Sequence, residues 1–267
     1  MNRRINTLIV MAVALVLASS CNSNNSEDPK EESPKEQVIA KANEEGEAYL
    51  ESIDLNDSLY KVNSLYYSRE VNGDIEWTQV IMTLNDSNQL LKMEEQFLLA
   101  GSETMFSNHF YFKEGKKYAT KQFFLEGEQD SSFFVELLSY YDEDEKVTAT
   151  KKRTAPYEDL LTQELYYVTE NKDCSADRAF DIANQTGSFE TTFQGFVDMA
   201  GFKYLVVGED KKDGFSSALI VQQTTPLIME LRNDESALIG TPLVVNFQTI
   251  TDATGSQQIL FGVARRQ

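Results

Sequence analysis

Between Leu59 and Arg153 the chain consists of extended segments separated by short turn sequences. Asn72-Gly73 follows the first segment, and Asn-Gly is among the strongest signals for a two-residue hairpin. Further turn sequences follow at 85–88, 101–103, 114–116, 127–130 and 142–144. The pattern predicts about seven antiparallel strands, each joined to the next along the chain.

The central segments carry apolar side chains on both faces. Phe110 and Phe112 share one face of the segment 104–113, while His109 and Tyr111 share the other. Because a sheet with one solvated face alternates apolar and polar residues, we expect both faces to be covered. Either helices simply bury the sheet, or it curves around an apolar groove for a ligand. The residues predicted to line such a groove are Phe106, Phe110, Phe112, Phe124, Phe134 and Tyr140.

Three stretches have helical spacing. Ser33-Pro34 resembles a helix start, with a capping hydroxyl and a proline at the first helical position, and predicts a helix to about Glu51. Apolar residues at helical spacing predict a second helix over 156–168 and a third over 175–185. These helices are expected to cover the sheet.

The region 187–267 returns to extended patterning. Strands are predicted over 189–197, 202–207, 218–221, 227–231, 243–250 and 257–264. The sequence 238–247, Leu-Ile-Gly-Thr-Pro-Leu-Val-Val-Asn-Phe, resembles the late strand of small OB-fold barrels in envelope lipoproteins. The preceding meander with its helices resembles the unclosed barrels of periplasmic lipoprotein carriers, which shelter acyl chains. The expected fold class is therefore mainly β: a curved antiparallel meander sheet with covering helices, followed by a small OB-like β-barrel.

The first residues have the layout of a cleaved export signal. Arg3 and Arg4 precede the apolar run Leu8–Leu17, which is too short to span a bilayer. Ser19-Ser20-Cys21 then resembles the lipobox of bacterial lipoproteins, although Ala18 stands where that family usually has leucine. The resemblance implies lipidation of Cys21; ordinary cleavage before Cys21, giving a soluble periplasmic or secreted protein, is the alternative.

The predicted domain organisation follows from these signals. Residues 1–20 form the signal peptide, and 21–36 form the lipidated cysteine with an acidic tether that has no aliphatic or aromatic side chain to bury. Residues 37–186 form the N-terminal helix, the meander and its connecting helices, and 187–267 form the barrel. As Asn22 follows the cysteine, the lipoprotein resemblance implies the outer membrane of a Gram-negative cell envelope.

The charge of the chain excludes one class of partner. The formal charge is −19, and it becomes two units more negative if the leader leaves with Arg3 and Arg4. Non-specific nucleic-acid binding depends on cationic surfaces, so no nucleic-acid partner is expected. The expected contacts are the membrane, through Cys21, and a hydrophobic ligand or an envelope protein.

Few residues are available for catalysis or metal binding. The chain has one histidine, His109, and only Cys174 remains as a thiol besides Cys21. Asp173 beside Cys174 would raise the pKa of the thiol, which opposes activation as a nucleophile. Zinc sites need clustered Cys and His, so no metal and no cofactor is expected.

The sequence thus predicts a non-enzymatic, membrane-anchored envelope lipoprotein that binds a hydrophobic or peptide ligand in a curved-sheet groove. A structural or interaction subunit of an envelope complex is the first alternative. A glycan or peptide hydrolase is the second, since glycoside hydrolysis needs only two suitably placed carboxylates.

Overall fold

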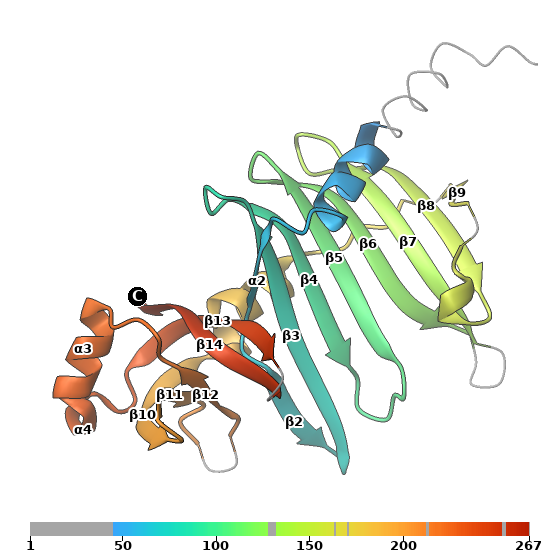
Figure 1. The fold of residues 1–267 in the computed structure, drawn as a ribbon. Helices are drawn as coiled ribbons and strands as arrows, with labels where there is room; N and C mark the ends of the chain where they lie inside the picture. The colour runs from blue at the N-terminus through green and yellow to red at the C-terminus, as the bar shows by residue number, and fades with distance from the viewer. Residues whose placement is uncertain are drawn as a thin grey trace, which may run out of the picture. The chain divides into compact units, whose positions relative to one another are not determined.

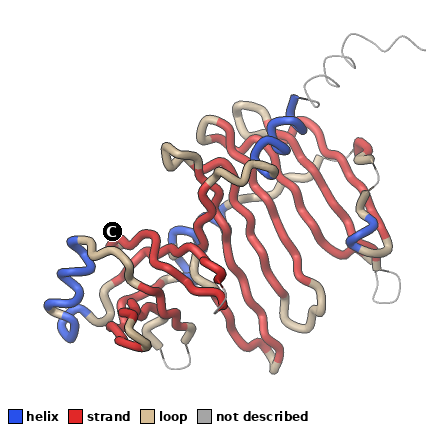
Figure 2. The backbone as a smooth tube through the Cα atoms, viewed as in Figure 1, coloured by secondary structure: helices blue, strands red, loops and turns tan. Residues whose placement is uncertain are grey.

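The computed structural model describes residues 45–127, 132–162, 164–169, 171–211, 214–252 and 255–266. Ala48–Gln267 forms one compact unit, shown as a ribbon in Figure 1. Strands dominate it, as the red segments of Figure 2 make plain. The predicted fold class is confirmed: an antiparallel meander with a few helices is followed by a small, closed, five-stranded OB-like barrel.

The meander contains two more strands than predicted. Its strands are β1 (Tyr60–Asn63), β2 (Tyr67–Val71), β3 (Asp74–Leu84), β4 (Leu90–Leu98), β5 (Met105–Lys113), β6 (Lys116–Glu126), β7 (Phe133–Tyr141), β8 (Val147–Ala155) and β9 (Tyr166–Val168). From β3 to β9 each strand pairs antiparallel with the next. The predicted hairpin at Asn72-Gly73 is present, with φ of 55° and 91° at its two central residues. Positive φ at both positions is what a type I′ turn requires.

The segment predicted as one strand over 59–71 is divided into β1 and β2. Both halves pair with β3, and the break falls at Ser64–Tyr66. Ser64 is buried there: its N–H donates to the Val80 carbonyl oxygen at 2.8 Å, and its Oγ accepts from the Val80 N–H at 2.9 Å. One serine thereby replaces part of the ladder and lets the edge strand bend.

The two faces of the meander have separate cores. On the helix face, Tyr111, Leu138 and Tyr140 pack beneath Leu50 and Ile53 of the N-terminal helix, of which residues 45–54 are described. The part of the predicted helix before residue 45 lies outside the described residues.

On the opposite face, here called the barrel face, the meander packs against α2 (Asp177–Asn184). Met93 and Phe110 of the meander share this core with Ile182 of α2 and with Phe193 and Phe247 of the barrel. The helix predicted over 175–185 is confirmed as α2, and sheet and barrel bury their apolar residues together.

The helix predicted over 156–168 is wrong. This segment forms the short 3₁₀ turn η1 (Glu158–Leu160) and then β9, which pairs with β8. Tyr166, Tyr167 and Val168 are residue types that favour strands, and the free edge of β8 offers them a partner. Tertiary pairing outweighs the helical spacing of the leucines.

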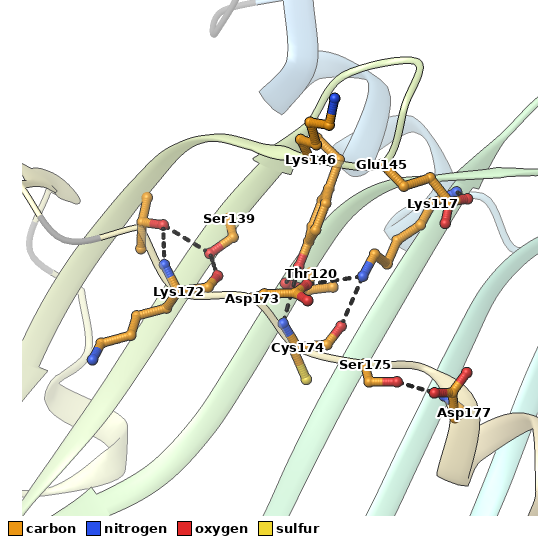
Figure 3. A network of polar contacts seen from close by, with 12 residues as sticks. Lys117, Thr120, Ser139, Glu145, Lys146, Lys172, Asp173, Cys174, Ser175 and Asp177 are labelled. Carbon is orange, nitrogen blue, oxygen red and sulfur yellow. Dashed lines mark hydrogen bonds and ion pairs between the residues drawn. The ribbon is translucent and has the colours of Figure 1, made fainter.

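The chain returns from β9 to α2 through a crossing segment, residues 171–176, on the barrel face (Figure 3). Ser139 and Thr150 lie beneath it: Ser139 Oγ donates to the Lys172 carbonyl oxygen at 2.7 Å, and the Lys172 N–H donates to Thr150 Oγ1 at 3.1 Å. Further along, the Cys174 N–H donates to Tyr141 Oη at 3.1 Å. The small side chains of Ser139 and Thr150 leave room for the backbone of the crossing segment. Their hydroxyls, with that of Tyr141, bond to its polar groups.

The C-terminal region forms the barrel. Its elements are η2 (Gly187–Phe189), β10 (Thr191–Met199), β11 (Phe202–Gly208), β12 (Ser216–Ile220), α3 (Pro226–Asn233), α4 (Glu235–Leu238), β13 (Pro242–Asp252) and β14 (Gly255–Arg265). The strands close in the order β10-β11-β12-β14-β13, with β13 pairing back to β10 and β12 parallel to β14.

The strand predicted over 227–231 is wrong, because the segment forms α3. Thr225 caps this helix: its side chain accepts the Ile228 N–H at 3.2 Å, and Pro226 occupies the first turn. Ile228 and Leu231 face the core, so a buried helix of apolar residues resembled a strand.

The barrel joins the meander at one seam. Asn63 of β1 lies opposite Phe247 of β13, and Asn63 Nδ2 donates to the Phe247 carbonyl oxygen at 3.4 Å. β1 therefore has a strand on either side, β3 and β13, and one continuous sheet passes from meander to barrel.

Candidate ligand-binding groove

A groove of about 790 Å³ opens beside the seam. Residues of β2 and β3 form its floor, residues of α2 form one wall, and residues of η2, β10 and the segment after β11 form the other. Its volume lies within the range of small-molecule and cofactor sites.

Aromatic packing fixes the floor against the barrel. The Tyr67 ring meets Phe189 edge-on at 5.0 Å between ring centroids and Phe215 at 4.6 Å. Tyr67 is buried, and its hydroxyl is without a hydrogen-bond partner among the described residues. Burial raises the pKa of Tyr67, so the hydroxyl stays protonated at neutral pH. The tyrosine acts as an apolar wedge between β2 and the barrel.

A buried ion pair positions the α2 wall. Arg178 of α2 bonds to Glu95 of β4, whose second carboxylate oxygen accepts from Asn108 Nδ2 at 3.0 Å. The guanidinium carbon lies 5.3 Å from the centroid of the Phe97 ring. Glu95 is buried, whereas the Arg178 side chain is 46% exposed. The arginine is therefore held from below, and its outer edge borders the groove.

The charged residues of the groove leave an excess of carboxylates. Five acidic residues and three basic residues line it. Each base has a carboxylate partner: Arg69 pairs with Glu76, Lys211 with Glu209, and Arg178 with Glu95. Asp210 is exposed at the rim. An uncharged or anionic ligand gains little electrostatic binding energy in this groove, whereas the cationic side chains of a ligand are attracted to the excess carboxylates.

The six aromatic residues predicted to line a groove lie on both faces of the sheet. Phe106, Phe110, Phe112 and Phe124 lie on the barrel face. Tyr140 and Phe134 lie on the helix face.

Their surroundings also differ. Phe110 and Phe112 are buried in the core shared with α2, and Tyr140 is buried beneath the N-terminal helix. Phe106 is half-buried and stacks on Phe97 at 5.6 Å, beside Arg178. Phe106 thus reaches the groove lining only through Phe97 and Arg178, and the six do not form one lining.

A polar cluster on the helix face fastens the end of the N-terminal helix. Asp54 accepts hydrogen bonds from Lys92 Nζ at 2.9 Å, Lys121 Nζ at 3.1 Å and Tyr111 Oη at 2.8 Å. Burial raises the pKa of Asp54, but the hydrogen bond and charge of Lys92, together with Lys121 and Tyr111, outweigh it and lower the pKa below the ordinary value. Burial, together with the charge and the hydrogen bond of Asp54, raises the pKa of Tyr111.

His109 lies at the margin of this cluster. Burial, together with the nearby charge of Lys92, lowers the pKa of His109 to about 4. Its Nε2 lies 3.8 Å from Glu94 Oε2, but a neutral imidazole at pH 7 makes no ion pair there. The ring packs against Phe123 at 5.2 Å.

His109 and Cys174 lie on opposite faces of the sheet. Cys174 belongs to the barrel-face core, and the sheet separates it from the imidazole. Burial, with a contribution from the charges of Glu95 and Asp173, raises the pKa of the Cys174 thiol to about 11. The thiol is protonated and the imidazole is not its neighbour. Among the described residues, no group of three or more His, Cys, Asp or Glu side chains could hold a metal ion.

Sequence reasoning missed the groove residues Tyr67, Trp77 and Arg178. The Asn72-Gly73 turn located the hairpin that forms the floor, but not its position against the barrel. That position depends on the pairing of Asn63 with Phe247, which are 184 residues apart. No local pattern carries this information.

Cys21, the predicted lipidation site, lies outside the described residues. Within the described part of the chain, no helix is long and apolar enough to cross a membrane. Comparisons with protein families, with curated proteins and with solved structures find no match to this chain.

Proposed function

We propose that this protein is a non-enzymatic lipoprotein of the cell envelope, anchored in the outer membrane through lipidated Cys21, and that it binds a peptide in the groove beside the seam. The observation that carries the proposal is the groove itself, with an aromatic floor, excess carboxylates and an open rim. The leader and the lipobox-like Ser19-Ser20-Cys21 support the location.

A peptide fits this groove better than an acyl chain. Acyl chains need an enclosed apolar cavity, whereas here ion pairs such as Arg69–Glu76 and Lys211–Glu209 border the space. Three of the six aromatic residues predicted to line a lipid groove, Phe110, Phe112 and Tyr140, are packed in the two cores. A peptide backbone and cationic side chains use the polar groups that are present.

No catalytic step forms part of the proposal. The protonated Cys174 thiol and the neutral His109 imidazole lie on opposite faces of the sheet, so they support no nucleophile–base pair.

Groove binding is tested by selecting peptides from a random library on the purified full chain and measuring their affinity. Trp77 lines the groove and is the only tryptophan of the chain, so its fluorescence reports binding. Asp210→Lys reverses a rim charge and should weaken selected peptides at least about fivefold. Asp86→Lys, the same change at an exposed turn outside the groove, is the matched control. Failure to select any peptide, or equal effects of both changes, contradicts the proposal.

Anchoring is tested separately by Cys21→Ser. The variant should leave the membrane fraction and should no longer incorporate labelled palmitate. Unchanged membrane association of the variant contradicts lipidation as the anchor.

One observation favours a second function, docking on a larger envelope assembly. The β10–β11 hairpin exposes Val197, Met199 and Phe202, with exposed fractions of 49%, 58% and 44%. A photo-crosslinking residue at position 199 should trap a partner in intact cells if this hairpin is an interface; an uncrosslinked protein rejects this alternative.

A further inference from the structure

Among the described strands, the barrel pairs with the edge of the meander only at β1, through Asn63 and Phe247. β1 pairs with β3 on one side and β13 on the other. β2, which continues the same edge, pairs with β3 alone, and no other described strand lies against it. After Asn63, β13 of the barrel no longer pairs with the meander, and β2 therefore has an edge that no described strand covers.

The hairpin register shows which backbone groups face that edge. In a two-residue hairpin the pair flanking the turn, here Val71 and Asp74, is hydrogen-bonded, and hydrogen-bonded pairs alternate along the ladder. Arg69 and Tyr67 therefore direct their N–H and C=O groups toward β3. The N–H and C=O groups of Ser68 and Glu70 point outward.

The groove lies beside this edge. Three consecutive β2 residues, Tyr67, Ser68 and Arg69, line it, so it follows the strand. Ser68, Arg69 and Glu70 are exposed, so an incoming strand displaces no packed side chain from them. The opposite wall belongs to the barrel, so a strand bound here would occupy the space between β2 and the barrel.

The charge of the groove indicates which kind of strand could bind there. Asp181 of α2 and Asp210 at the rim border this space, whereas Glu190 on the barrel side pairs with Arg266 at 3.1 Å and the three lining bases already have carboxylate partners. The whole chain carries a formal charge of −19. A second copy of this acidic chain would bring like charges together, whereas a lysine- or arginine-rich segment would not.

We propose that an extended basic peptide segment of a partner protein binds by adding a strand to the free edge of β2. This rests on the proposed peptide-binding function and specifies its mode. The backbone groups of Ser68 and Glu70 provide the ladder, as in other cases of strand addition. The surrounding carboxylates select cationic side chains at alternate positions of the peptide.

The test uses the full chain and a capped peptide of alternating lysine and threonine, with Trp77 fluorescence as the readout. Trp77 lies opposite Ser68 in the ladder and stacks on Tyr66 at 5.1 Å, so a strand added at β2 should change its emission. The corresponding glutamate–threonine peptide should bind at least about tenfold more weakly.

Ser68→Pro removes one outward N–H and places a ring at the edge. Proline is tolerated on edge strands whose N–H faces solvent, so the hairpin should persist. The dissociation constant should rise at least about tenfold, because a backbone hydrogen bond is lost and the approach is blocked.

Peptide N-methylation gives a second measurement that does not depend on how the variant folds. Methyl groups on every second amide, in the register that faces β2, should abolish binding, while methyl groups in the other register should leave it within about threefold. Equal effects of the two registers overturn strand addition.

The outcomes separate this inference from the proposed function. If Asp210→Lys weakens peptide binding but Ser68→Pro and both methylation registers do not, peptides bind the groove without adding a strand, and only the inference fails. If no peptide binds, the proposed function and the inference both fail. If the protein dimerises in sedimentation experiments and Ser68→Pro makes it monomeric, the edge belongs to a second copy, and the inference is overturned.

Discussion

The two halves of the meander's first edge, β1 and β2, have the same neighbour β3 but different surroundings. β1 lies between β3 and β13; Val62 of β1 and Phe247 of β13 are buried there. Three of the five β2 residues are exposed. The half that pairs with the barrel supports the fold, whereas the half that does not has surface to offer a ligand.

The polar cluster beneath the N-terminal helix differs in a similar way from the edge at β2. Asp54 accepts hydrogen bonds from Lys92 and Tyr111 beneath the helix, and the neutral His109 lies at the margin of this cluster. At β2, by contrast, the unpaired groups are backbone groups at a strand edge. The binding potential of this protein therefore lies in the main chain more than in its reactive side chains.

The largest expected effect is at the seam. Phe247→Ala removes a side chain that is 1% exposed and packs in the core shared by sheet and barrel, so we expect a loss of about 4 kcal/mol in the free energy of unfolding. Urea denaturation measures it. Phe261→Ala, on the neighbouring strand β14 and 46% exposed, should cost less than about 1 kcal/mol. Similar costs for the two would show that the seam is not a core.

Proline substitution compares the two halves of the edge directly. Asn63 has strand neighbours on both sides, so Asn63→Pro removes a ladder hydrogen bond whichever way its N–H points, at a cost of about 2–3 kcal/mol. Ser68→Pro should cost less than about 1 kcal/mol, since its N–H faces the free edge. Thermal unfolding monitored by circular dichroism distinguishes them. A larger cost for Ser68→Pro than for Asn63→Pro would mean that β2 is covered and β1 is not.

The N-terminal helix that precedes β1 is fastened to the meander by charge. Asp54→Ala leaves Lys92, Lys121 and Tyr111 without their shared acceptor and should cost about 2 kcal/mol at pH 7. The folded-state pKa of Asp54 is lowered, so its contribution is fully present above the unfolded value of about 3.9 and is lost as the pH falls through the folded value.

The difference between wild type and Asp54→Ala should therefore shrink as denaturation is repeated from neutral pH to below about pH 4. Asp86→Ala, at an exposed turn, serves as the control and should show little effect at any pH. A constant difference across this range would mean that the charge of Asp54 does not fasten the helix.

The smallest effect is expected at the open half. Arg69 pairs with Glu76 at 2.5 Å, but the Arg69 side chain is 72% exposed. Arg69→Ala should change the free energy of unfolding by less than about 0.5 kcal/mol. A loss comparable with that of Asp54→Ala, measured under the same conditions, would show that the hairpin depends on this pair.

Local signals in the sequence predicted most elements correctly. Asn72-Gly73 located a hairpin, and the spacing of 175–185 predicted α2. The errors fall where short apolar stretches suit two structures. The segment 156–168 contains a strand, β9, because the edge of β8 was free to pair. The segment 227–231 is part of α3, as its start signal Thr225-Pro226, of the same kind as Ser33-Pro34, indicates.

The candidate site was less predictable, for a physical reason. The alternation in 104–113 identified apolar residues on both faces but could not show that Phe110 and Phe112 would be covered by α2. The groove exists because β13 pairs with β1 and leaves β2 open, and only the folded chain brings these strands together.

The order of synthesis gives the seam one more consequence. A growing chain that ends before β13, Pro242–Asp252, already contains every strand of the meander but not the one that covers β1. Until that late strand emerges, the entire margin from residue 60 to 71 is available to any neighbouring chain, and closure over so many intervening residues is slow. Chaperone dependence during biogenesis, and aggregation of C-terminally truncated chains, would both originate at this margin.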